Sequence, residues 1–540
     1  MRLFCYFNRS CNINTLFLQH TKAGTNKPFT DMTRIRQIAV AFAFMASATL
    51  CAQTDTAETN TALHNRHSES ITSRNTISTR YEAGSVFGSG DYAPMWHFTN
   101  RQGAGSHKND WAYARVGVNG SNRFDRSGIE LKWGADVIGG YDLTSNLFIQ
   151  QAYLDFNWKR LRVSLGQKER WSELQNPRLS TGALVESGNA RPIPQIRIEL
   201  PEYWNIPGTK GWFGIKGHIA YGWFTDEDWQ KDFVAADKAR TTGVRYHSKA
   251  GFARFGNEER FPLTAEMGLH MVSQFGGNTY NWCNNEGEFV NSPTRPKEYW
   301  TAFFPTKGDS RHTLSDQVNI AGNMLGSWLG AITWNDKEWK LRLTYEHVFE
   351  DHSQMFWEYG IWTEQLVGLE LELKSFKWIK GITLEYFNLK NQSGPIYHDT
   401  NSLIPDQISC ADNNYWHHTY NGWFNYGTII GTPLVTSPVY NTDNTLGVYN
   451  NRVEAFHMGI EGSPLAWLDY RLLLTKSNNW GTYARPFTRM KGNSSGLFEL
   501  TFTPNSKWSI KTSFAFDNGE LYGDNYGGMI TVTRHDIFGF

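Results

Sequence analysis

The stretch that decides the fold is AYLDFNWKRLRVSL, residues 152–165. Side chains of a β-strand alternate between two faces, so the apolar residues of this stretch share one face and the polar residues share the other. A Lys159-Arg160 turn separates the two halves. The stretch predicts a tight hairpin. Its apolar face carries Ala152, Leu154, Phe156, Trp158, Leu161, Val163 and Leu165.

The same period of two recurs along the chain. It is found in residues 339–346 and in residues 369–374, where leucines alternate with glutamates. Residues 498–502 and 508–516 flank a Pro504-Asn505-Ser506 turn in the same manner. The composition agrees, because aromatic residues make up 15% of the chain and favour strands. We therefore predict an all-β chain of paired amphipathic strands.

A soluble antiparallel sheet with one face in water gives the same alternation. Three features favour a transmembrane barrel instead. Tryptophans gather at strand ends, as in an interfacial girdle, and short turns at one end of the strands contrast with long polar loops at the other. The chain also stops at Phe540, on an aromatic strand of the kind that marks outer-membrane barrels for assembly. The tryptophans concerned are Trp158, Trp334, Trp339, Trp378 and Trp508.

Closure and size follow from the physics of the bilayer. An unpaired backbone group in hydrocarbon costs several kcal/mol, so the first and last strands must pair. Allowing roughly 25 residues for each strand with its turn or loop, the region from Tyr81 to Phe540 holds on the order of 18 strands. Such a barrel encloses a space wide enough for water.

The N-terminal region indicates export. Ile38 to Leu50 is an apolar run that is too short to cross a bilayer as a helix but suits the core of a signal peptide. Arg34 and Arg36 precede it, and a cleavage site is expected between Ala52 and Gln53.

We expect residues 1–52 to be a leader with a signal peptide, residues 53–80 a flexible periplasmic segment, and residues 81–540 the barrel. Met32 is an alternative start, because signal peptides normally begin at their charged segment. The barrel is expected to act as a monomer in the outer membrane, surrounded by its lipid.

The cysteines and the charge limit the partners. Cys51 raises a lipoprotein alternative, but Leu50 replaces the small residue that normally precedes a lipidated cysteine. After export Cys283 and Cys410 remain, either as a disulfide between loops or as two thiols. Lys plus Arg and Asp plus Glu both number 52, so no basic excess exists to bind nucleic acid.

One segment, residues 178–197, departs from the alternation. Its Ser187-Gly-Asn-Ala-Arg-Pro192 stretch resembles the signature of the Wzi family of capsule-assembly proteins. Residues 316–323 and 423–434 resemble two further family blocks in the same order. The resemblance implies an 18-stranded outer-membrane barrel that binds capsular polysaccharide as a lectin-like anchor and is not an enzyme. The chain shows no long helical N-terminal segment of the sort found in some members, which leaves a periplasmic helical bundle in doubt.

Two long insertions, residues 276–319 and 391–451, are expected outside the cell or in the barrel mouth. Sugar binding needs aromatic faces together with polar groups that hydrogen-bond hydroxyls. The aromatic candidates for polysaccharide binding are Tyr299, Trp300, Tyr415, Trp416 and Trp423, and the alternative is that these rings only pack the loops.

The irregular segment adds Asn189 and Arg191 as polysaccharide-binding candidates. Arg191 lies beside Pro192, which breaks regular pairing, and an unpaired buried charge is costly. We expect Glu169, Glu173 or Glu186 to balance it, in a role that is structural more than ligand-binding.

No metal site, cofactor or catalytic residue is predicted. His417 and His418 are adjacent, and neighbours on a strand point to opposite faces; no carboxylate completes a ligand set nearby in sequence. They are expected in a solvated loop. The sequence therefore favours a surface polysaccharide (exopolysaccharide) lectin over two alternatives, a diffusion channel and an outer-membrane glycan hydrolase.

Overall fold

The structure is a computed structural model that describes residues 75–124, 127–350, 354–357, 360–392, 397–399, 407–409 and 413–540. The expected leader and signal peptide lie outside the described residues, as does most of the expected periplasmic segment. Cys410 lies outside them as well, so both alternatives for Cys283 and Cys410, a disulfide or two thiols, stay as the sequence left them.

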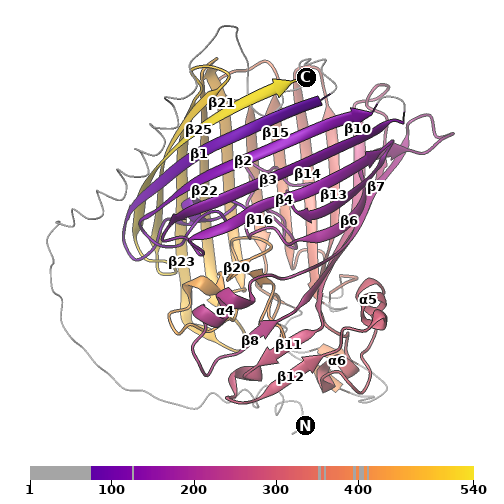
Figure 1. Cartoon of the computed structure of the whole chain (residues 1–540), viewed down its shortest axis with the longest axis vertical. Coiled ribbons are helices and arrows are strands. Elements are labelled where there is room, and N and C mark those ends of the chain that lie inside the picture. Colours follow the sequence, from indigo (N-terminus) through magenta and orange to yellow (C-terminus); the bar gives the residue numbers. More distant parts are fainter. Residues whose placement is uncertain are drawn as a thin grey trace, which may run out of the picture.

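Eighteen antiparallel strands form one closed barrel, which confirms the predicted fold and strand number (Figure 1). Each strand pairs with the next along the chain, and the first pairs with the last from Thr76–Gly539 to Ser89–Tyr526. No strand edge therefore faces lipid. The first nine strands are β1 (Asn75–Ser89), β2 (Trp111–Phe124), β3 (Ile129–Tyr141), β4 (Leu147–Trp158), β5 (Leu161–Gln167), β6 (Gln195–Asn205), β7 (Phe213–Trp223), β9 (Arg245–Phe255) and β10 (Leu263–Phe275). The other nine are β13 (Asn323–Asn335), β14 (Trp339–Glu350), β15 (Gln365–Leu373), β16 (Gly381–Asn388), β21 (Val453–Leu465), β22 (Leu468–Gly481), β23 (Pro486–Phe502), β24 (Trp508–Gly519) and β25 (Asn525–Gly539).

The predicted hairpin is β4–β5, with Trp158 opposite Leu161. Leu154, Phe156 and Trp158 are each at least 40% exposed on the outer wall, whereas Asp155 is fully buried on the inner wall. In a soluble sheet the apolar face would be covered by protein, so this orientation rules out that alternative.

The barrel begins earlier than expected. Strand β1 starts at Asn75, not near Tyr81, and its first residues pair with both β2 and β25. Residues 75–80 contain Ile77 as their only large apolar side chain, so hydropathy alone gave no strand signal there. Backbone pairing with two neighbours supplies the missing stabilisation.

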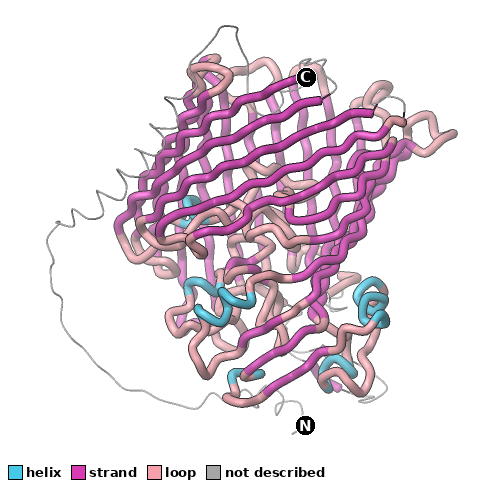
Figure 2. The backbone as a smooth tube through the Cα atoms, in the orientation of Figure 1, coloured by secondary structure: helices cyan, strands magenta, loops and turns pink. Residues whose placement is uncertain are grey.

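The two ends of the barrel differ, as predicted. Turns between strands are short at the end where both described termini lie, and the long loops lie at the opposite end (Figures 1 and 2). Trp158, Trp334, Trp339 and Trp508 lie within one residue of a strand end beside the short turns, and Trp378 lies in such a turn. In outer-membrane barrels the short turns are periplasmic and the long loops extracellular.

The long loops carry their own small elements. A three-stranded sheet is formed by β8 (Arg240–Thr242), β11 (Gly277–Tyr280) and β12 (Phe289–Ser292). Among the described residues, no helix combines the length and the apolar character needed to span a bilayer. The remaining elements are α3 (Met95–Phe98), α4 (Glu227–Phe233), η1 (Trp282–Asn284), α5 (Pro296–Phe303), α6 (Leu314–Val318), β17 (Tyr397–Asp399), β18 (Gln407–Ser409), β19 (Phe424–Asn425), β20 (Thr428–Ile429) and η2 (Pro438–Tyr440).

Candidate functional site

Three loop segments fold back into the barrel and pack against its inner wall. They are residues 90–110, 168–194 and 413–452, and we call them the luminal plug. Their apolar side chains share one buried cluster with inward-facing residues of the wall. The cluster includes Met95, Leu184, Trp423 and Ile430 from the plug and Val348, Phe387, Ala455, Leu473 and Ala515 from the wall. Burial of apolar surface therefore holds the loops inside the lumen.

Residues 168–194 cross the lumen from β5 to the opposite wall. The backbone N–H and hydroxyl of Thr181 both donate to Glu385 of β16, at 2.8 and 2.7 Å. The His457 ring of β21 lies 2.7 Å from the carbonyl oxygen of Leu179. The segment is joined to β5 and β6 on one side and contacts the paired strands β16 and β21 on the other, which fixes it across the barrel.

The other two plug segments hold residues 184–191 in place. Trp423 donates its indole N–H to the carbonyl of Val185 at 2.8 Å, and Tyr415 donates its hydroxyl to that of Leu184 at 2.8 Å. Asn189 donates to the carbonyl of Ile429 and accepts from the N–H of Asn100. The signature-like stretch is thus the junction of all three loops.

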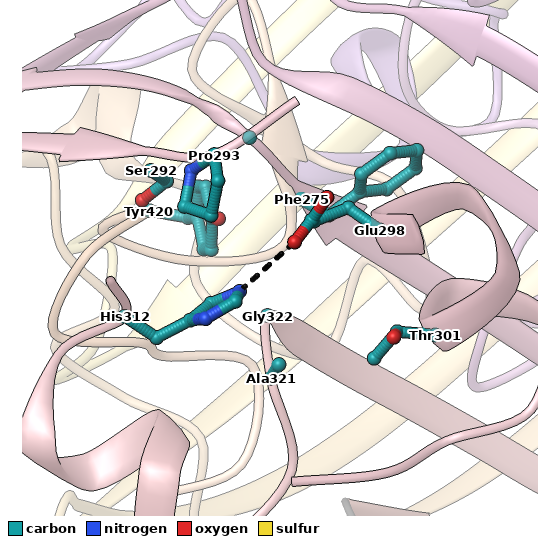
Figure 3. Close-up of a pocket in the computed structure, with 10 residues that line it drawn as sticks. Phe275, Ser292, Pro293, Glu298, Thr301, His312, Ala321, Gly322 and Tyr420 are labelled. Carbon is teal, nitrogen blue, oxygen red and sulfur yellow. Dashed lines mark ion pairs between the residues drawn. The ribbon is translucent and has the colours of Figure 1, made fainter. Parts of the chain in front are cut away.

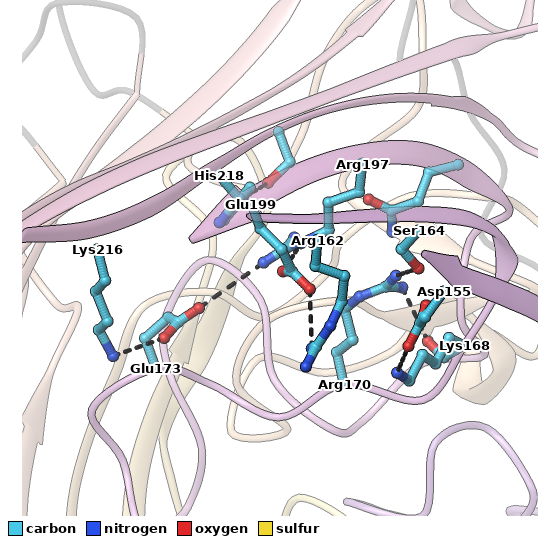
Figure 4. Close-up of polar contacts among 12 residues, drawn as sticks. Asp155, Arg162, Ser164, Lys168, Arg170, Glu173, Arg197, Glu199, Lys216 and His218 are labelled. Carbon is cyan, nitrogen blue, oxygen red and sulfur yellow. Dashed lines mark hydrogen bonds and ion pairs between the residues drawn. The ribbon is translucent and has the colours of Figure 1, made fainter. Parts of the chain in front are cut away.

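A cavity that is open to solvent lies beside residues 168–194; the space at this site, with adjoining open solvent included, is about 750 Å³. Two of its lining residues, Glu173 and Arg197, belong to a chain of ion pairs (Figure 4). Lys216 contacts Glu173 at 2.9 Å, Glu173 contacts Arg197 at 3.8 Å, and Arg197 contacts Glu199 at 2.6 Å. Arg162 completes the chain at 3.1 Å from Glu199. Glu173 comes from the plug segment, and the other four charges come from β5, β6 and β7, whose polar faces point inward.

Arg170 lines the same cavity without a carboxylate partner. Its guanidinium donates to the hydroxyl of Ser164 at 3.0 Å and to the carbonyl of Lys168 at 3.2 Å. Within the described part of the chain, no carboxylate lies at ion-pairing distance from it. Burial and the like charge of Arg197 lower the pKa of Arg170 to about 10, so it stays charged at neutral pH. The cavity therefore holds a cation whose charge is only partly balanced.

Trp171 gives the cavity an aromatic face. Its side chain is 45% exposed, which is unusual for an indole inside a barrel. The ring lies against Gly188, where a Cβ would come within 2.2 Å of ring atom Cζ3. One side of the indole is thus supported by plug backbone, while the exposed part is free for a ligand. A supported aromatic face beside amide, guanidinium and carboxylate groups is the combination that a sugar requires.

The sequence analysis missed Trp171 and Arg170. Both precede the irregular segment that drew attention, and neither belongs to a recognisable motif. A tryptophan next to three charged residues, Lys168, Glu169 and Arg170, outside an alternating strand was the available signal.

Arg191 is buried at 4% exposure, and its expected partners were wrong. Glu169 pairs with Arg115, Glu173 with Lys216, and Glu186 with His270. The Arg191 guanidinium instead lies between the rings of Phe148 and Tyr426, 3.7 Å from each centroid. Burial lowers the pKa of Arg191 to about 10. Aromatic faces attract a cation without carrying a charge, which explains how the side chain is tolerated.

Asn189, Tyr415 and Trp423 are all at most 1% exposed. Each ring of this size buries roughly 150–250 Å², so turning either ring out to a ligand would forfeit about 4 kcal/mol. In this structure these three residues hold the plug together.

Tyr299 and Trp300 lie elsewhere, on α5. Tyr299 packs on Tyr221, with ring centroids 5.5 Å apart, and Tyr221 shares the outward face of β7 with the exposed Ile219. Helix α5 therefore covers the outside of the wall at its extracellular rim. Trp300 is 67% exposed there, in the position of an interfacial girdle residue. Trp416 is partly buried within the third plug segment. The five aromatic candidates therefore do not form one surface.

Comparisons with known proteins identify the fold. No family model and no curated protein matches the chain. Among solved structures, Wzi of Escherichia coli, described as an outer-membrane protein involved in group 1 capsule assembly and a carbohydrate-binding β-barrel, aligns with a TM-score of 0.50. It is 12% identical, over 85% of this chain and 84% of Wzi.

Two barrels of Pseudomonas aeruginosa align less well, both with a TM-score of 0.43. OccK3 (OpdO) is 10% identical over 86% of this chain and 96% of its own. OprD is 7% identical over 86% and 95%. The Wzi alignment, the closed barrel and the apolar outer wall together make this chain an outer-membrane β-barrel, located in the outer membrane.

Proposed function

We propose that this barrel binds a surface polysaccharide and anchors it to the outer membrane without cleaving it. The observation that carries the proposal is the cavity, in which the exposed Trp171 face lies beside Arg170, Lys168 and Glu173. A sugar ring stacks on an aromatic face through its C–H groups, and its hydroxyls bond to charged and amide side chains.

The charge of the cavity favours an acidic polysaccharide. Arg170 lacks a carboxylate of its own, and a uronate or phosphate group on the ligand would balance it. Resemblance to the Wzi family and likeness in fold to a carbohydrate-binding barrel support a role in capsule assembly for a monomeric protein.

A diffusion channel is the second candidate, because a barrel of 18 strands encloses a space wide enough for water and this one has a charged inner wall. The luminal plug weighs against it. For the loops to leave the lumen, the apolar cluster that they share with the wall would have to separate.

Binding is tested with the full-length protein, purified in detergent, on an array of bacterial surface polysaccharides. We expect selective binding to acidic glycans and a loss of at least tenfold in affinity, about 1.4 kcal/mol, for Trp171→Ala. Trp467→Ala is the matched control, because Trp467 is 46% exposed but lies in a periplasmic turn. Its affinity should equal that of the wild type.

Two outcomes would replace the proposal. Absence of glycan binding together with a stable porin-sized current in planar bilayers would establish the channel. New reducing ends after incubation with a bound polysaccharide would establish a hydrolase.

A further inference from the structure

The two long extracellular loops meet at a group of three side chains that the proposed function does not use. Asp316 comes from α6, and His417 and His418 come from a turn near the start of the third plug segment. The Nε2 atoms of His417 and His418 lie 3.8 and 3.7 Å from Oδ1 of Asp316. One ligand atom from each residue lies within 4.8 Å of the other two.

The sequence-based expectation for the histidines was wrong in two respects. Their side chains are only 12% and 17% exposed, so they do not lie in a solvated loop. They also do not lie on a strand, and the turn lets both rings face the same way, with centroids 4.2 Å apart. The carboxylate that was missing in sequence comes from the other long loop.

The buried carboxylate of Asp316 is not balanced by a lysine or arginine among the described residues. It is 2% exposed, and its Oδ1 atom receives no hydrogen bond from any described residue. The described residues also place no lysine or arginine at ion-pairing distance from it. A buried carboxylate with one bare oxygen is costly unless a cation or a donor reaches it.

The present hydrogen bonds of the rings are weak competitors. The Nδ1 atom of His417 accepts from the N–H of Thr419 at 3.1 Å, and Nε2 of His418 lies 3.1 Å from the Thr313 hydroxyl. Two ligands bound tetrahedrally at about 2.1 Å lie roughly 3.4 Å apart. The two separations between Asp316 and the histidines, 3.8 and 3.7 Å, exceed this by only a few tenths of an ångström. A small rotation of the rings would exchange these bonds for a metal.

A neighbouring cluster shows the contrast. Glu298, Asp309 and His312 are equally close together, and Figure 3 shows His312 beside Glu298. There Arg295 pairs with both carboxylates, and Lys297 adds a second cation 3.4 Å from Asp309. The positive charge that the Asp316 cluster lacks is already supplied.

We propose that Asp316, His417 and His418 bind one divalent transition-metal ion, with Zn²⁺ as the preferred ion, and so join residues 276–322 to the luminal plug. Two imidazole nitrogens and one carboxylate oxygen are ligands that zinc accepts, with water completing the coordination. The metal balances the buried carboxylate and connects the surface loops to the interior.

The test is equilibrium binding of Zn²⁺ to the full-length protein after treatment with a chelator. We expect one equivalent to bind the wild type, and Co²⁺ in its place to give the visible absorption of a tetrahedral site. Asp316→Asn and His418→Gln should each weaken binding at least tenfold. Glu298→Gln, the matched control, should bind as the wild type does, because Arg295 already occupies that cluster.

The proposal is overturned if the stripped wild type binds no stoichiometric Zn²⁺, or if Asp316→Asn and His418→Gln bind it as well as wild type. Heat-modifiable migration on gels checks that each variant is folded, and if one of them is not, the other decides. The result is independent of glycan binding, since Trp171 lies in the luminal cavity and not in this cluster.

Discussion

Arg191 shows how the lumen accommodates a charge that carboxylates do not neutralise. The sequence placed an arginine between an alanine and a proline, and the cost of burying a charge predicted a glutamate partner. The structure instead places the guanidinium between Phe148 of β4 and Tyr426 of the plug, 3.7 Å from each ring centroid. The side chain thus links the third plug segment to the wall, because it contacts one ring from each of them.

We expect Arg191→Lys to destabilise the protein by about 1–2 kcal/mol, since an ammonium keeps the charge but cannot stack flat between two rings. Thermal unfolding in detergent measures the effect. Arg452→Lys, at a less buried site over the single ring of Tyr483, should shift the midpoint less. Equal midpoints for wild type and Arg191→Lys would show that the stacking contributes nothing.

Among the elements, β21 is shaped to receive the plug. Gly459 faces inward in this strand, and a Cβ there would lie 2.5 Å from the carbonyl oxygen of Leu179. His457, two residues earlier on the same face, contacts that same carbonyl. The glycine brings the strand and the plug backbone into direct contact, and the histidine fixes their register.

Gly459→Ala should loosen residues 168–194 while leaving the barrel intact, because the clash is with backbone that cannot rotate away. We expect faster proteolytic cleavage within 168–194 and unchanged heat-modifiable migration of the barrel. Gly492→Ala in β23 is the control, since a Cβ there meets nothing within 4 Å. Identical cleavage rates for the two variants would mean that the plug is not docked on β21.

At the scale of the whole molecule, an exposed apolar side chain faces either the hydrocarbon of the membrane or water, depending on its place in the barrel. Leu369 in the middle of β15 is 40% exposed and lies between Leu343 and Leu384 on the outer wall. Leu314 on α6 is 49% exposed in the extracellular loops. The first side chain faces hydrocarbon and the second faces water, although their exposed fractions are similar.

Leu369→Arg should therefore cost about 2–4 kcal/mol of folding free energy in lipid, whereas Leu314→Arg should change it by less than about 0.5 kcal/mol. Urea-induced unfolding in lipid vesicles measures both. Similar costs for the two variants would contradict the position of the membrane belt.

The alternation of residues 152–165 and its repeats predicted paired amphipathic strands. Together with the tryptophans at strand ends, the contrast between short turns and long loops, and the aromatic last strand, it predicted a closed barrel, its strand number and the end that carries the loops. This information is local, because a strand's two faces are set by a period of two and the bilayer forces every backbone group to pair. Even the error at the start of β1 was local, since residues 75–80 pair without an apolar signal.

The interior was decided only by tertiary structure. Trp171 is exposed in the cavity, whereas Tyr415 and Trp423 lie in the buried core of the plug. Asp316 lies close to His417 and His418, which are far from it in sequence. No periodicity constrains a loop, so its position depends on which apolar side chains and unmatched charges the closed wall presents to it. That wall exists only once all eighteen strands have paired.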